Sequence, residues 1–213
     1  MKARIALFAV AMYSAVTLPA ASQRPRVELH TNRGALVVEL FPEQAPQSVD
    51  TFLRTVQDGY YDGTLFHRVI KGLLIQGGAF QPGMQEKPAR PPIPNESKHC
   101  MPNTRGTIAL SHAEAPDSSS SQFFINLADN HGLDFDATAS AGAGYCAFGR
   151  VVSGMKTVSA IAATPVVSGG DFMGDVPAEE IIIESARVLP ANARSGDDDG
   201  EVAHEFGDDH VGP

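Results

Sequence analysis

The chain has 213 residues, of which 43% are apolar, and a formal net charge of −9 at pH 7. This length and apolar content suit one globular domain with a core of its own. The negative charge argues against nucleic acid as a partner, because phosphate binding needs a basic face.

Residues 1–22 have the form of an export signal. Lys2 and Arg4 precede an uncharged, mostly apolar run, and small residues before Gln23 suit a cleavage site. The run is shorter than the roughly 20 apolar residues that span a membrane. An uncleaved anchor is therefore the less favoured alternative, and we expect no stable membrane insertion after cleavage.

The next segment predicts a β-hairpin followed by a helix. Residues 27–31 alternate in polarity, 32–34 have a turn composition, and 35–41 form a second apolar run. In the range 46–57 apolar residues recur at helical spacing along one face. A proline in its first turn and Gly59 beyond its end suit a helix with these limits.

Residues 66–80 contain two short apolar runs, broken at Lys71-Gly72 and closed by Gly77-Gly78. Such runs suit short buried strands rather than a helix. Arg68 and Gln76 lie inside them, and an arginine in an apolar run needs a partner or a function because an unpaired buried charge is costly. Taken alone, a salt bridge or a solvent-reaching edge position explains Arg68 better than chemistry does.

Loops and short strands make up most of the remaining chain. Residues 81–102 contain six prolines and predict a stiff surface loop. A second helix with one apolar side is predicted at 154–163. Further strands are predicted at 107–111, 122–127, 145–152 and 181–189. Many short strands with two helices indicate an all-β barrel or sandwich.

Cys100 and Cys146 are the only cysteines. Export to an oxidising compartment would permit a disulfide, but two cysteines do not make a framework, and the sequence does not reveal their geometry. Both lie in or near apolar runs, so two buried free thiols are favoured over a bridge.

The runs 66–80 and 121–125 together resemble the two signatures of the cyclophilin family of peptidyl-prolyl isomerases, F-H-R-[VI]-I-x-G-[FL]-x-x-Q-G-G and S-Q-F-F-I. Shorter stretches at 59–61, 103–108 and 148–151 agree with the family as well. The resemblance covers about residues 27–190 and is closest to the periplasmic cyclophilins of Gram-negative bacteria. It implies a closed eight-stranded antiparallel barrel capped by the two α-helices.

Composition and the resemblance together divide the chain into an expected signal peptide (1–22), an isomerase domain (23–190) and an acidic tail (191–213). The tail has seven acidic residues and one arginine, and we expect it to be disordered. The implied protein is a periplasmic monomer that binds unfolded or proline-containing polypeptides and needs no cofactor or metal.

The implied activity is cis–trans isomerisation of X-Pro bonds in an apolar surface groove. Rotation about a peptide bond has a barrier of about 18–20 kcal/mol, because the nitrogen lone pair is shared with the carbonyl. A hydrogen bond to the prolyl nitrogen weakens that sharing in the transition state. Arg68 is a permanently charged planar donor, and Gln76 could orient it or contact the substrate carbonyl; these two are the predicted catalytic residues.

The resemblance also implies which residues bind the substrate, here called the proline site. Phe124 would form its floor, three leucines its walls and Tyr145 its closing side, while polar residues would pin the peptide. The set is Leu73, Leu74, Ser111, His112, Gln122, Phe124, Leu133 and Tyr145.

Three positions depart from common family patterns. Leu73 stands where many relatives have Phe. Gly132 stands where eukaryotic relatives have Trp and bacterial ones often have Phe, and Tyr145 stands where eukaryotic relatives have His. The family's cyclosporin-type inhibitors bind this site, and an indole at position 132 would supply one rim of it. The glycine therefore predicts weak sensitivity to such inhibitors.

Two other function classes remain open. A cyclophilin-like chaperone would bind proline peptides with little catalysis; the intact Arg68 argues against it, and the missing side chain at Gly132 argues for it. A hydrolase would need His67 or His112 beside a serine, but no Gly-x-Ser-x-Gly elbow is present. Neighbours on a strand point to opposite faces, so we expect His67 to be buried and hydrogen-bonded, away from Arg68.

Overall fold

The computed structural model describes residues 24–113, 115–138, 144–169 and 172–191. The expected signal peptide, 1–22, lies outside these ranges, as does all but the first residue of the expected acidic tail, 191–213. The described residues lie almost entirely within the range predicted for the folded domain, 23–190.

Eight antiparallel strands close into a barrel in the order β1-β12-β3-β4-β8-β7-β9-β2. Their bounds are β1 Arg26–Thr31, β2 Gly34–Leu40, β3 Thr64–Ile70, β4 Leu74–Gly77, β7 Thr107–Leu110, β8 Phe123–Asn126, β9 Ala147–Ser153 and β12 Ile182–Val188. The last strand closes the barrel on the first, with Val27 opposite Val188. The predicted all-β fold, a closed eight-stranded antiparallel barrel, is confirmed.

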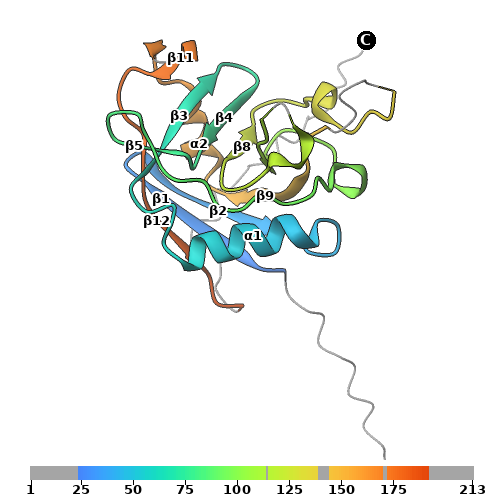
Figure 1. Ribbon diagram of the computed structural model, residues 1–213. Coiled ribbons are helices and arrows are strands. Elements are labelled where there is room, and N and C mark those ends of the chain that lie inside the picture. The colour runs from blue at the N-terminus through green and yellow to red at the C-terminus, as the bar shows by residue number, and fades with distance from the viewer. Residues whose placement is uncertain (1–23, 114, 139–143, 170–171, 192–213) are drawn as a thin grey trace, which may run out of the picture.

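Two helices cover the barrel, α1 (Pro46–Gln57) and α2 (Met155–Ala162). Phe52 of α1 and Ile161 of α2 are fully buried and belong to the same core cluster. Figure 1 shows α1 crossing the lower side of the barrel, with α2 lying behind β3 and β4. Within the described ranges, no helix is long and apolar enough to cross a membrane.

Strand alternation sorts the apolar side chains into two clusters. One set, including Val69, Ile75 and Phe123, fills the core together with the helices. Residues of opposite parity, such as Leu74 and Phe124, form a smaller cluster. Because neighbouring strand residues point to opposite faces, this second cluster lies on the outer wall. The outer-wall cluster consists of Leu74, Ala109, Phe124 and Ala147.

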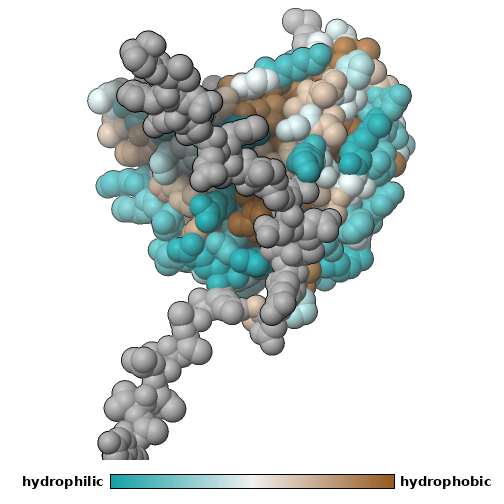
Figure 2. Space-filling view, turned by 180° about the vertical axis from the view of Figure 1, so that it is seen from behind, coloured by the Kyte–Doolittle hydropathy of each residue, from teal (hydrophilic) through white to brown (hydrophobic). Residues whose placement is uncertain are grey.

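The surface is mostly polar. Seen from behind, it mixes large hydrophilic areas with smaller hydrophobic ones (Figure 2). Among the residues whose burial is described, the exposed large apolar side chains are Phe135, Val167 and Val188. They come from separate elements, and scattered apolar residues of this kind are normal for a protein surface.

Several short elements escape the sequence prediction. The most substantial is the hairpin of β10 (Val166–Gly169) and β11 (Phe172–Pro177), a two-stranded sheet outside the barrel. It lies beside β3, at the top of the view in Figure 1. The others are β5 (Phe80–Gln81), β6 (Gln85–Glu86) and the 3-10 turns η1 (Ser97–His99), η2 (Pro116–Ser118) and η3 (His131–Leu133).

The expectation of two free thiols is wrong, because Cys100 and Cys146 form a disulfide. Their Cα atoms are 5.3 Å apart, although 46 positions separate them in sequence. An isolated antiparallel bridge pairs Met101 with Ala147, the residues that follow the two cysteines. This bridge brings the proline-rich loop back to the start of β9 and places the two sulfur atoms together.

Candidate active site

The barrel register assembles the predicted catalytic pair and the floor of the proline site in one row. Arg68 on β3 lies opposite Gln76 on β4. Gln76 lies opposite Phe124 on β8, which in turn lies opposite Ala109 on β7. Directly opposed residues in antiparallel strands have Cβ atoms about 4.5–5.5 Å apart on the same face. The row therefore runs from a charged donor to an apolar surface across four adjacent strands.

The apolar half of this site contains the predicted pocket residues. Leu73 and Leu133 pack against the outer-wall cluster, as does Tyr145. The Tyr145 ring meets Phe124 edge-on, with centroids 5.3 Å apart, and stacks on His112 at 4.3 Å. The structure thus brings together an aromatic floor, leucine walls and a second aromatic ring at the rim.

The polar half links three of the predicted residues directly. Gln76 donates from Nε2 to Oε1 of Gln122, at 2.9 Å, and to Oγ of Ser111, at 3.2 Å. Both hydrogens of the Gln76 amide therefore have acceptors on the β7–β8 side of the site. This arrangement fixes the Gln76 side chain, which is almost fully buried, beside Phe124.

Arg68 forms an ion pair that the sequence analysis considered but could not assign. Its Nε and Nη2 atoms donate to Oδ2 of Asp175 on β11, at 3.2 and 3.0 Å. The Arg68 side chain remains 33% exposed and that of Asp175 27% exposed. The guanidinium is thus both anchored and accessible. Sequence reasoning missed Asp175, because it lies 107 positions from Arg68 in a hairpin that no periodicity predicted.

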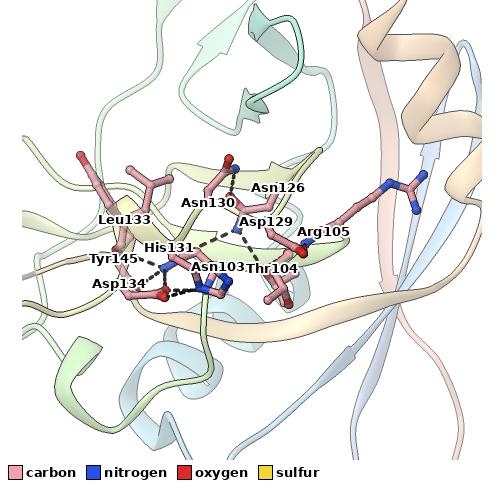
Figure 3. A network of polar contacts seen from close by, with 11 residues as sticks. Asn103, Thr104, Arg105, Asn126, Asp129, Asn130, His131, Leu133, Asp134 and Tyr145 are labelled. Carbon is pink, nitrogen blue, oxygen red and sulfur yellow. Dashed lines mark hydrogen bonds and ion pairs between the residues drawn. The ribbon is translucent and has the colours of Figure 1, made fainter.

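Two buried asparagines support the walls of the proline site from behind (Figure 3). The Nδ2 atom of Asn103 donates to the backbone carbonyls of Leu133, at 3.1 Å, and Tyr145, at 3.0 Å. The Nδ2 atom of Asn130 donates to the carbonyl of Leu73 at 2.9 Å. Two predicted wall leucines and the closing Tyr145 are therefore held through their backbones by side-chain amides.

The same network anchors the η3 turn that carries Leu133 and Gly132. Asn103 donates from its backbone N–H and from Nδ2 to Oδ1 of Asp134, at 2.6 and 3.0 Å, and His131 Nδ1 lies 3.0 Å from Oδ2. Burial alone would raise the pKa of the Asp134 carboxyl, but hydrogen bonds from Asn103 and His131 outweigh it and lower that pKa. Asp134 is therefore an ionised acceptor at neutral pH. The N-T-R-G stretch counted toward the family resemblance, but its sequence did not reveal this role.

His67 is buried beside the candidate site, as expected. It lies at a β-bulge between Phe66 and Arg68, and its ring packs against Phe80 with centroids 4.6 Å apart. Burial lowers the pKa of His67 to about 4; a hydrogen bond with the Leu65 backbone opposes this shift, and the charge of Arg68 adds to it. The imidazole is therefore neutral at pH 7 and is a structural residue.

This lowered pKa predicts a pH-dependent stability. Between pH 6.5 and 4 the unfolded chain binds a proton at His67 that the folded chain does not, so stability falls as pH falls. The expected loss is about 3 kcal/mol, at 1.36 kcal/mol for each pKa unit. Urea unfolding at pH 7 and pH 4 measures it, with His67→Gln as the control that cannot protonate. Equal losses in both proteins would assign the effect to other groups.

Comparison with known proteins extends the sequence resemblance. The family model for cyclophilin type peptidyl-prolyl cis-trans isomerases matches residues 26–188. Peptidyl-prolyl cis-trans isomerase B of Escherichia coli (strain K12) is 45% identical over 162 residues, which cover 76% of this chain and 98% of that protein. A peptidyl-prolyl cis-trans isomerase of Acinetobacter baylyi is 42% identical over 166 residues, covering 78% and 86% respectively.

A solved structure agrees with these relatives. The cyclophilin type isomerase of Cryptosporidium parvum, crystallised in the presence of the dipeptide ala-pro, matches with a TM-score of 0.65 and 29% identity, covering 78% of this chain and 99% of that one. The range matched by the family model contains all eight barrel strands, both helices and the candidate site. The chain therefore belongs to the cyclophilin family and is a cyclophilin-type peptidyl-prolyl cis-trans isomerase.

Proposed function

We propose that this isomerase acts on exported polypeptides and that Arg68 drives the reaction by donating a hydrogen bond to the prolyl nitrogen. The observation that carries the proposal is the row of Arg68, Gln76 and Phe124 across three paired strands. In this row a permanently charged donor and an aromatic side chain that suits a proline ring lie on either side of Gln76. A bound peptide would reach both groups from the outer wall of the barrel.

In the proposed mechanism the proline ring packs on Phe124, between Leu133 and Tyr145. As the X-Pro bond rotates, the prolyl nitrogen becomes pyramidal and its lone pair becomes available to a donor. A hydrogen bond from Arg68 then stabilises the twisted bond more than either planar isomer. This lowers the barrier to rotation for the bound substrate. The apolar surroundings strengthen this bond by excluding water.

Gln76 has a supporting role in this proposal. Its two amide hydrogens are engaged by Ser111 and Gln122, so it would offer a further partner its carbonyl oxygen rather than a hydrogen. We assign it to fixing the polar side of the site beside Arg68. Gln122 and the backbone at Ser111 and His112 would hold the extended peptide.

The alternative is a binding chaperone that holds proline peptides with little catalysis. A refolding protein whose slow step is prolyl isomerisation separates the two. An enzyme present at one hundredth of the client concentration should accelerate refolding without changing the yield. A chaperone would raise the yield only near equimolar amounts and would leave the rate unchanged, which would contradict the proposal.

Two observations support export to the periplasm. The first is the signal-like composition of residues 1–22. The second is the Cys100–Cys146 disulfide, since such bonds persist mainly in oxidising compartments. Intact-mass measurement of protein recovered from a periplasmic fraction should give a chain beginning at Gln23. Recovery of the full-length chain from membranes would contradict this part of the proposal.

Gly132 predicts weak inhibition by cyclosporin. A glycine offers the inhibitor neither a hydrogen bond nor apolar cover, and these together are worth at least about tenfold in affinity. A Cβ atom at Gly132 would meet nothing within 4 Å, so the backbone accepts a side chain there, and Gly132→Trp should tighten inhibition by about that factor. Inhibitor titration of both proteins in one isomerase assay tests this.

The substrate itself should be affected less, because its proline would pack on Phe124 rather than on this rim. Gly132→Trp should therefore keep its turnover within about twofold. Strong inhibition of the natural sequence would mean that another residue, such as Phe135, rebuilds the rim. His131 is a weaker candidate for that, because its ring is already bonded to Asp134.

A further inference from the structure

We propose that Asp175 is a positioning residue for catalysis, which holds the Arg68 guanidinium in the orientation that the reaction needs. The inference rests on the proposed role of Arg68 as the donor to the prolyl nitrogen. It assigns a function to the β10–β11 hairpin, which is not part of the barrel. Asp175 itself would not touch the substrate.

The geometry of the ion pair favours positioning over simple charge neutralisation. One carboxylate oxygen, Oδ2 of Asp175, accepts from both Nε, at 3.2 Å, and Nη2, at 3.0 Å. These two donors form one edge of the planar guanidinium, so together they define the plane and direction of the group. Nη1 lies on the opposite edge of the guanidinium from the edge that meets Asp175.

The hairpin is built to present this carboxylate to β3. Its strands pair with Val166 opposite Pro177 and Val167 opposite Val176, and Ala178 N–H donates to the carbonyl of Pro165 at 2.8 Å. Pro177 is buried, whereas Asp175 is only partly so. Since the barrel closes through β12 and β3 without the hairpin, the hairpin is not needed to complete the sheet.

Folding stability gains little from such a pair. Both side chains are about a third exposed or slightly less, and solvent-exposed ion pairs contribute little to folding. An arginine side chain has many rotamers, however, and a catalytic group acts well only when its neighbours hold it close to the productive geometry. The main effect of losing Asp175 should therefore appear in the rate rather than in stability.

The test measures kcat and KM for a proline peptide with Asp175→Ala and Asp175→Asn, each made in the natural sequence and in an Arg68→Ala background. We expect Asp175→Ala and Asp175→Asn each to lower kcat by about tenfold, with KM changed by less than about twofold. In the Arg68→Ala background the same change should have no further effect, because the residue acts through Arg68. Asp175→Glu, which keeps the carboxylate, should recover part of the loss.

Asp62→Asn is the matched control. Asp62 accepts a hydrogen bond from Arg187 Nη1 at 2.8 Å, and its side chain is 31% exposed. The substitution therefore removes a comparable ion pair away from the site. Its kcat should not change. All variants should be checked for an unchanged melting temperature before their rates are compared.

Each other outcome has a separate meaning. An unchanged kcat for Asp175→Ala would overturn the inference. A raised kcat would overturn it too, because Asp175 would then restrain Arg68 rather than hold it in the productive orientation. An equal loss in both backgrounds would show that Asp175 acts on the fold and not through Arg68, and would overturn it as well. All of these results leave the proposed function intact if Arg68→Ala alone is slow. A normal rate for Arg68→Ala would overturn the proposed mechanism itself.

Discussion

Replacing Arg68 with alanine is expected to lower kcat/KM for a proline-containing peptide by about two to three orders of magnitude, the loss typical when one preorganised donor is removed from an active site. The reason is specific to the transition state, because the prolyl nitrogen offers its lone pair only as the bond twists. A protease-coupled isomerase assay measures the rate. The binding surface at Phe124 is untouched by this substitution.

Arg68→Lys separates the effect of the positive charge from the effect of the planar guanidinium. Lysine keeps the charge but replaces the planar fork with a compact ammonium group, so we expect it to be nearly as slow as alanine. Both variants should keep the melting temperature of the natural protein within a few degrees, since Arg68 is on the outer wall and its side chain is 33% exposed. A rate close to that of the natural sequence in Arg68→Ala would favour the binding-chaperone alternative.

The second large effect should come from the disulfide. The double substitution Cys100→Ala and Cys146→Ala removes the disulfide, which closes a loop that spans 46 positions. In the chain-entropy model a closed loop of that size stabilises the folded state by about 4 kcal/mol. Urea unfolding of the oxidised natural protein and of the double variant gives the difference in the free energy of unfolding.

The natural protein treated with a strong reductant is the control for this prediction. It should unfold at nearly the same urea concentration as the double variant, because both lack the same cross-link. A difference of less than about 1 kcal/mol between oxidised and reduced protein would mean that the Met101–Ala147 bridge and its surroundings hold the loop without the covalent bond.

The strands and helices were predictable because their signals are local, whereas the closed eight-stranded barrel was implied by the family resemblance. Alternating polarity at 27–31 and the apolar run at 35–41 predicted the first hairpin, and the apolar stripe through Phe52 predicted α1. The two motif runs then placed Arg68, Gln76 and Phe124 on neighbouring strands, and the register confirms that neighbourhood. The spacing of apolar residues and the order of motifs can be read from the sequence without any knowledge of tertiary contacts.

The contacts that escaped prediction join distant parts of the chain. Asp175 reaches Arg68 from a hairpin whose strands are short and carry no regular alternation, and the cysteines meet only because Met101 pairs with Ala147. Asn103 similarly connects the carbonyls of two separate loop residues. A polar residue in a loop has many possible partners, and its sequence position does not select among them.

The most direct test of the central claim is to measure binding and isomerisation of the same peptide at once. Exchange spectroscopy by NMR on a labelled Ala-Pro peptide gives both the dissociation constant and the rate of cis–trans interconversion in the bound state. We expect Arg68→Ala to bind the peptide within a few-fold of the natural protein while its bound-state interconversion is slower by at least about a hundredfold. An unchanged bound-state rate, with the loss of activity explained by weaker binding alone, would contradict it.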